Sequence, residues 1–216
     1  MELVIDPRFR GPDSSGNGGY ACGRIAAFVE GPARVTLRLP PPLGVPLLVA
    51  DGRVWHGDVL VAEVEPGEVG LDPPEPPSWD EAVEAQHPDA DSPFPNCFVC
   101  GALREDGLRI FAGRVAGRDV FAAPWVPSPD TVGDEFVWAA LDCPGAYATG
   151  AMSGRGVIVL GRLTAHVLRV PAAGERCVVV GWPLGSRGRK HEAGTALFAG
   201  DELLGLARAV WIEPRG

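Results

Sequence analysis

The sequence contains no apolar run that approaches 18 residues, the length that a membrane-spanning helix requires. Its first residues carry no basic segment followed by a long apolar stretch, so we expect no signal peptide. A dense positive charge is missing too, because the formal net charge of the 216 residues is -9. That balance excludes a protein that coats nucleic-acid phosphates, but a few local donors would suffice for a small anionic ligand.

Cysteine is scarce, and its spacing argues against a metal site. The chain has five cysteines, an odd number in a sequence without an export signal, which favours reduced thiols in a cytoplasm. Cys97 and Cys100 form a Cys-x-x-Cys pair, but the usual structural zinc site needs a second pair. Cys22, Cys143 and Cys177 are each isolated in the sequence. We therefore expect no metal and no cofactor.

Two motifs of cofactor and hydrolase chemistry are incomplete. The stretch 16–21 fits a loose Gly-x-Gly-x-x-Ala pattern, but no hydrophobic strand precedes it, as dinucleotide binding requires. The stretch 150–154 does not fit the Gly-x-Ser-x-Gly spacing of a serine nucleophile. We therefore exclude both kinds of site.

Two long apolar segments are predicted to form buried helices. The first covers residues 18–30, and Ser14, Ser15 or Asn17 is its candidate N-cap. The second covers residues 133–148 and carries one acid deep inside an otherwise apolar run. A helix that is apolar on most sides must be covered by other elements, most simply by a β-sheet.

Alternating or short apolar runs predict the strands, and 22 prolines and 29 glycines, gathered at segment borders, predict the turns. A Pro-rich acidic stretch at 72–96 is an expected linker, with a short capped helix at 78–86 inside it. The expected strands cover residues 34–39, 46–50, 54–65 (a pair broken near Gly57), 108–111, 120–123, 156–170, 176–184 and 193–213 (folding back near Gly200).

The two halves of the chain repeat one plan. Residues 54–66 and 197–214 each contain Gly-Asp, an apolar strand and then Glu-Pro. An internal repeat of one apolar helix and several antiparallel strands predicts an α+β fold with two units side by side. We predict units at residues 1–72 and 101–216, joined by a Pro-rich linker at 73–100.

These motifs resemble the hotdog fold in its tandem, or double hotdog, form, and the thioesterase superfamily in particular. Asn17-Gly18-Gly19 resembles the His-Gly-Gly opening of the central helix in small acyl-CoA thioesterases, with Asn in place of His. Leu141-Asp142 resembles the acidic end of that motif. The segment 96–108 resembles a Cys-Phe-Val-Cys-Gly…Gly-Leu segment before the first strand of many hotdog proteins. The resemblance implies two fused units, each with a central helix wrapped by an antiparallel sheet, and hydrolysis of an acyl-CoA thioester.

Each half lacks what the other half carries. In the first helix Ala26 stands where the motif has its acid, and the second helix opens with Gly-Asp-Glu instead of His-Gly-Gly. An acid eight residues along a helix lies about 12 Å from the start of that helix, so it reaches only a carbonyl held by a neighbouring antiparallel helix. We predict one active site, built from Gly18, Gly19 and Asp142, and a second, inactive location with two acids beside its helix start.

Thioester hydrolysis requires amide donors for the carbonyl oxygen and a nucleophile for the carbonyl carbon. A helix start opened by glycines offers free N–H groups and no side chain to block approach. The amides of Gly18 and Gly19 are therefore the candidate oxyanion hole, and Asp142 is the candidate nucleophile or general base. For the glycines the alternative is a plain helix-entry turn. For Asp142 it is a buried aspartate bonded to a backbone amide, or one that faces solvent at a kink made by Pro144.

Several further residues are candidate substrate contacts. Asn17 either touches the thioester or caps the first helix. The aromatic residues that would line an acyl pocket, or pack in the core, are Tyr20, Trp138 and Tyr147. The one basic cluster, a candidate for the phosphates of coenzyme A or a solvated turn, comprises Arg187, Arg189 and Lys190.

The preferred function is hydrolysis of a medium-chain or aromatic acyl thioester, with coenzyme A as part of the substrate. Hotdog hydratases need a helix histidine near the acid, often five residues after it, where this chain has Tyr147. The alternative function is a non-catalytic module that binds an acyl or other apolar ligand. We expect a small-molecule partner and neither nucleic acid nor membrane, and a homodimer is an open alternative to a monomer.

Overall fold

The computed structural model describes residues 1–89, 92–151 and 156–214. The strands are β1 (Glu2–Val4), β2 (Ala33–Leu37), β3 (Pro46–Ala50), β4 (Arg53–His56), β5 (Val59–Pro66), β6 (Gly113–Arg114), β7 (Phe121–Trp125), β8 (Val159–Val167), β9 (Cys177–Arg187), β10 (Lys190–Ala199) and β11 (Glu202–Ile212). The helices are α1 (Gly18–Ala26), α2 (Trp79–Ala85), α3 (Asp134–Ala140) and α4 (Cys143–Ala148), with short 3-10 turns at η1 (Pro7–Phe9) and η2 (Pro129–Thr131).

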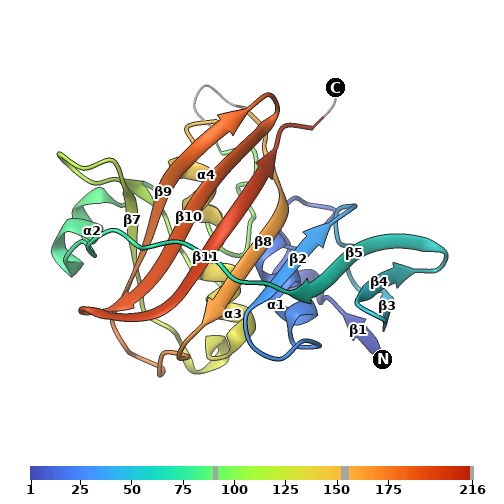
Figure 1. Ribbon diagram of the computed structural model, residues 1–216. Coiled ribbons are helices and arrows are strands. Elements are labelled where there is room, and N and C mark those ends of the chain that lie inside the picture. The colour runs from blue at the N-terminus through green and yellow to red at the C-terminus, as the bar shows by residue number, and fades with distance from the viewer. Residues whose placement is uncertain (90–91, 152–155, 215–216) are drawn as a thin grey trace.

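Within the described residues, one 11-stranded sheet runs through the molecule in the order β1-β3-β4-β5-β2-β8-β11-β10-β9-β7-β6. Neighbouring strands are antiparallel, and the two halves of the chain meet where β2 pairs with β8. At this junction Val35 pairs with Leu163, and both side chains are fully buried. Figure 1 shows helices α1, α3 and α4 behind the sheet and α2 beside its β7 end. These elements agree with the expected α+β class.

The second half of the sheet is covered on both faces. Along β9, Cys177 and Val179 belong to the main core, whereas Val178 and Val180 belong to a smaller cluster that also contains Ala82 of α2. Alternate residues of a strand point to opposite faces, so α2 packs on the face away from the other helices. The expected short helix at 78–86 is therefore confirmed as α2, and Ser78 caps it by accepting a hydrogen bond from Glu81 N.

The two buried helices α1 and α3 run antiparallel and in close contact. A Cβ atom on Gly19 would lie 2.6 Å from Trp138 O, and one on Gly23 would lie 2.7 Å from Glu135 Cα. Residue numbers therefore rise from 19 to 23 along α1 while those of the contacting residues in α3 fall from 138 to 135, as expected for antiparallel helices. Glycine at both positions permits this approach, because any side chain would push the helices apart.

The second predicted helix is broken, which corrects the expectation of one helix over 133–148. It divides into α3 and α4, and the break lies at Leu141 and Asp142. Pro144 follows the break and lacks the N–H that would continue the helix hydrogen bonds. The break places Asp142 at a helix junction rather than on a continuous helix face.

Two other expectations about elements were wrong, and one strand was not expected. The stretch 108–111 is a buried loop rather than a strand, because its amides at 108 and 110 pair with the carbonyls of residues 98 and 99. The first helix ends at Ala26 and gives way to a turn instead of continuing to 30. The short strand β1, which pairs with β3, was not expected.

The expected hairpins are confirmed. The pair β4–β5 turns at Gly57, and the pair β10–β11 turns at Gly200, both glycines having positive φ angles. No helix in the described part of the chain has the length and apolar character needed to cross a membrane. The boundaries at residues 72 and 100 stay a prediction.

Candidate functional site

The start of α1 faces the break between α3 and α4. Asn17 caps α1, because its Oδ1 atom accepts a hydrogen bond from Tyr20 N at 2.9 Å. The same side chain donates from Nδ2 to Asp142 Oδ2 at 2.9 Å. Asn17 therefore joins the first half of the chain to the second half at one buried point, with both residues 2% exposed.

Asp142 is a buried carboxylic acid held on one oxygen only. Its Oδ2 atom accepts hydrogen bonds from Gly19 N at 2.8 Å and from Asn17 Nδ2 at 2.9 Å. Its Oδ1 atom is buried and has no hydrogen-bond partner among the described residues. Burial raises the pKa of Asp142 to about 7, and the hydrogen bonds from Gly19 and Asn17 act in the opposite direction.

The two glycines at the start of α1 differ in what their amides do. Gly19 N is committed to Asp142 at 2.8 Å. Gly18 N donates to no group in the described chain, and Gly18 is only partly buried. First-turn amides of a helix lack partners inside the helix. Gly18 therefore offers the open N–H group at this helix start.

A cavity of about 380 Å³ lies beside these groups. Gly18, Asn17 and Asp142 line it, and so do the side chains of Cys97, Cys100 and Cys143. The rest of the lining is largely apolar and includes Phe94, Leu160, Tyr147 and Trp211. Small-molecule sites have this character, with apolar walls and a few converging polar groups.

The predicted acyl-pocket aromatics divide between the cavity and the core. Tyr147 lines the cavity. Tyr20 stacks on Phe9 with ring centroids 4.0 Å apart, and it also contacts Phe136. Trp138 packs against α1 at Gly23. The structure thus places Tyr20 and Trp138 in the core between the helices and outside the cavity lining.

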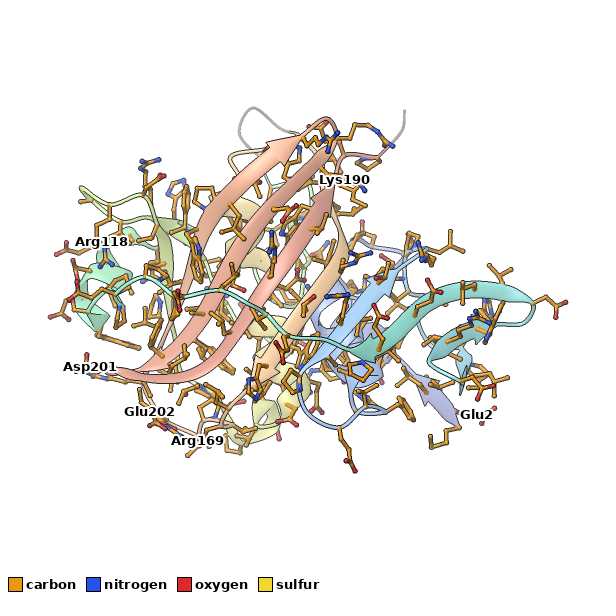
Figure 2. The ribbon with its side chains drawn as sticks, in the orientation of Figure 1. Glu2, Arg118, Arg169, Lys190, Asp201 and Glu202 are labelled. Carbon is orange, nitrogen blue, oxygen red and sulfur yellow. The ribbon has the colours of Figure 1, made fainter. Side chains whose placement is uncertain are left out.

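The basic cluster lies at the hairpin between β9 and β10, where Lys190 pairs with Ile212 of the cavity wall. Arg187, Arg189 and Lys190 belong to the turn between β9 and β10, and Figure 2 shows Lys190 at the tip of this hairpin. None of the three lines the cavity. Arg189 Nη1 donates to Glu213 O at 2.7 Å, so the Arg189 side chain is bound to the residue that follows β11.

Sequence reasoning missed the convergence of Cys143 with Cys97 and Cys100, and much of the cavity wall. Cys143 is isolated in the sequence, yet its sulfur lies 3.9 Å from that of Cys97. Its position next to Asp142 was a usable signal, because Asp142 was already expected at the meeting point of the halves. Leu160 and Trp211 come from β8 and β11, and no local pattern distinguishes them from other buried strand residues.

Comparison with known proteins bears on the fold. No protein-family model and no curated protein matches the sequence. A tesB protein from Mycobacterium avium subs paratuberculosis and a candidate thioesterase II from Thermobifida fusca YX each match with a TM-score of 0.64 at 13% identity, covering 99% of this chain and 92% of theirs. A protein of unknown function with a hot dog fold from Alicyclobacillus acidocaldarius matches with a TM-score of 0.61 at 11% identity, covering 100% of this chain and 93% of its own. The chain therefore adopts a hotdog, thioesterase-like fold.

Proposed function

We propose that this protein hydrolyses an acyl thioester, with Asp142 as nucleophile or general base. The observation that carries the proposal is a buried carboxylic acid, fixed through one oxygen, at the wall of an apolar cavity that an open helix amide also lines. A nucleophile and an amide donor at one cavity are what acyl transfer from a thioester requires. The fold of the solved thioesterase-like proteins is consistent with this chemistry.

The contacts suggest a division of roles. Gly19 N and Asn17 Nδ2 position Asp142 through Oδ2, so Oδ1 would attack the thioester carbon or remove a proton from an attacking water molecule. Gly18 N would then donate a hydrogen bond to the carbonyl oxygen and stabilise the negative charge that develops on it. Because the pKa of Asp142 is raised to about 7, its carboxylate is a stronger base than an exposed aspartate.

The cavity favours an apolar acyl group. Its aromatic residues Phe94, Tyr147 and Trp211 would surround a medium-length chain or an aromatic ring. Coenzyme A as the thiol part remains a proposal, as does contact between its phosphates and Arg187, Arg189 and Lys190. A cytoplasmic location and a homodimer also remain proposals.

We also propose that the fold is a double hotdog with one working site. Each half would contribute a central helix, α1 in the first and α3 with α4 in the second. Ala26 offers no carboxylate at the position in α1 that corresponds to the acid of the motif, whereas Asp142 supplies one in the second half. The second location, near Asp134 and Glu135, would therefore be inactive.

One observation favours the alternative of a non-catalytic binding module. Gly19 N already donates to Asp142, so a bound carbonyl oxygen would find the single free amide of Gly18 rather than two. Loss of one donor from an oxyanion hole typically lowers kcat by about 100- to 1,000-fold. The cavity would then bind an acyl or other apolar ligand without cleaving it.

Release of free thiol from a panel of acyl-CoA substrates distinguishes the two functions. The panel should span short, medium and aromatic acyl groups. Asp142→Asn keeps the size of the side chain and removes the base, so we expect at least a ~100-fold loss of kcat/KM. Asp134→Asn is the matched control, because Asp134 is exposed and lies outside the cavity lining.

We expect the Asp134→Asn protein to keep the wild-type rate. Equal rates for the wild-type and Asp142→Asn proteins, or no turnover anywhere in the panel, would reject the hydrolase proposal. Saturable binding of an acyl-CoA without turnover would then support the binding module.

A further inference from the structure

Three cysteine side chains meet beside Asp142, although they come from distant parts of the sequence. The Sγ atoms of Cys97, Cys100 and Cys143 all lie within 4.8 Å of one another. The distance from Cys97 Sγ to Cys143 Sγ is 3.9 Å. All three residues are buried, and all three line the cavity. Cys143 thus supplies a third sulfur where the sequence showed only a pair.

The turn at 97–100 presents two of these sulfurs on a well-anchored backbone. Gly101 N donates to Cys97 O at 2.8 Å, and a Cβ atom on Gly101 would lie 2.5 Å from that oxygen. The turn therefore requires a residue without a side chain at 101. The two residues between the cysteines accept hydrogen bonds from the 108–110 loop through their carbonyls. The sulfurs consequently sit on a rigid support.

Hydrogen-bond donors surround the sulfur of Cys97. Asn17 Nδ2 lies 3.7 Å from Cys97 Sγ and 3.9 Å from Cys143 Sγ. The sulfurs of Cys97 and Cys143, 3.9 Å apart, also share a hydrogen bond. Such donors stabilise a thiolate, which is the form of cysteine that binds metals.

We propose that Cys97, Cys100 and Cys143 bind one thiophilic divalent cation of the zinc class. Zinc–sulfur bonds of about 2.3 Å in a tetrahedral site imply sulfur–sulfur distances of about 3.8 Å. The Cys97–Cys143 distance of 3.9 Å is close to that value, and the third sulfur needs only a small shift to match it. Binding of Zn²⁺ converts three thiols to thiolates and releases three protons, so the occupied site carries a net charge of -1.

The fourth coordination position of such an ion is open to the cavity. All three cysteines line the cavity, so a water molecule or another donor there completes a four-coordinate site. Asn17 supports both the thiolates and Asp142, because its Nδ2 atom contacts Asp142 Oδ2 at 2.9 Å as well as the two sulfurs. The proposed ion would therefore share a hydrogen-bonding residue with Asp142, yet its binding does not depend on hydrolysis.

Metal content of the wild-type protein tests the proposal directly. The protein is produced in zinc-supplemented medium, purified under reducing conditions and analysed by elemental mass spectrometry. We expect about one zinc ion per chain, and titration of the metal-free protein with Co²⁺ should give thiolate-to-cobalt charge-transfer absorption. Zinc below a tenth of an ion per chain together with no charge-transfer band on Co²⁺ titration would overturn the proposal.

Serine variants locate the site. Cys143→Ser and Cys100→Ser should each weaken zinc binding by at least ~10-fold in a chelator competition. Cys177→Ser is the matched control, because Cys177 is fully buried but is not part of the cluster, and it should bind zinc as the wild type does. Unchanged zinc binding in folded Cys143→Ser protein would contradict the assignment. A wild-type mass two hydrogens lower without bound metal would show a disulfide instead.

Discussion

At the residue scale, the molecule concentrates its unusual chemistry around Asn17 and Asp142. Asn17 is an N-cap and also a donor to a buried carboxylic acid. Asp142 in turn uses only one of its two oxygens within the described chain. A buried polar atom without a partner is expensive unless a ligand or water satisfies it. The unpartnered Oδ1 atom therefore marks Asp142 as the residue of this cavity wall to test first.

Replacement of Asn17 should show its double role. Asn17→Ala removes the cap of α1 and one of the two donors to Asp142, so we expect a loss of about 2–4 kcal/mol in the free energy of unfolding. Urea denaturation measures the change. Ser78→Ala is the matched control, because Ser78 caps α2 at the surface and touches no buried acid. It should cost only about 1 kcal/mol. Equal losses would mean that Asn17 acts as a cap alone.

Gly19 is predicted to tolerate no side chain. A Cβ atom there would lie 2.5 Å from Asp142 Cβ and 2.6 Å from Trp138 O, and neither atom is the end of a flexible side chain. Gly19→Ala should therefore lower the free energy of unfolding by about 1–3 kcal/mol and displace Asp142. Thermal unfolding and a crystal structure of the variant provide the measurements. A variant with wild-type stability and unmoved Asp142 would show that α1 and α3 are packed less tightly than described.

At the element scale, the break between α3 and α4 determines where the acid lies. The sequence contained the cause, Pro144, but a continuous apolar run suggested one helix. Elements with a local signal were predicted well: the Gly57 and Gly200 hairpins and the Ser78-capped helix all appear as expected. Elements that depend on contacts with distant parts of the sequence were predicted poorly. The loop at 108–111 is apolar like a strand, yet its partner is the 97–100 turn.

The same distinction holds for the candidate site. The proximity of Gly19 and Asp142 was predictable, because two complementary fragments of one motif imply antiparallel helices. The convergence of Cys143 with Cys97 and Cys100 was not predictable, since it depends on how loop 97–100 folds against the start of α4. The roles proposed for these residues stay predictions until they are measured.

The segment between β8 and β9 is held by an ion-pair network that should respond to pH. Arg169 contacts both Glu175, at 2.7 Å, and Glu202, at 2.8 Å, and Figure 2 shows Arg169 and Glu202 near each other at the sheet end. Hydrogen bonds from Arg169 and from the backbone of Ala172 lower the pKa of Glu175 to about 2. A lowered folded-state pKa stabilises the protein above the unfolded pKa, and this stabilisation is lost as pH falls toward 2.

Glu175→Gln should therefore reduce the dependence of stability on pH below about pH 4. Urea denaturation at a series of pH values between neutrality and the acid limit of folding measures the effect. Glu68→Gln is a suitable control, because Glu68 is exposed and has no ion pair among the described residues. A wild-type and a Glu175→Gln protein with parallel stability curves would contradict the proposed contribution of this network.

At the scale of the whole molecule, the two halves share one sheet and one core. The pairing of β2 with β8 brings Val35 against Leu163, and the main core contains residues from both halves. Because these contacts cross the boundary between the halves, neither half buries its apolar surface alone. We therefore expect one cooperative unfolding transition.

Substitution at this junction tests that expectation. Leu163→Ala should lower the free energy of unfolding of the entire protein by about 2–5 kcal/mol, because Leu163 is fully buried. Leu184→Ala is the control, since Leu184 is 36% exposed, and its effect should stay within about 0.5 kcal/mol. Circular dichroism and tryptophan fluorescence should report the same transition. Two separate transitions, with only one shifted by Leu163→Ala, would mean that the halves fold independently.

The central claim is that Asp142 and Gly18 N act on one thioester in the cavity. A crystal structure with an uncleavable acyl-CoA analogue, in which a methylene group replaces the thioester sulfur, tests it most directly. We predict the carbonyl oxygen within about 3 Å of Gly18 N, the carbonyl carbon facing Asp142 and the acyl group among Phe94, Tyr147 and Trp211. An analogue bound elsewhere, or one whose carbonyl points away from both groups, would contradict the account.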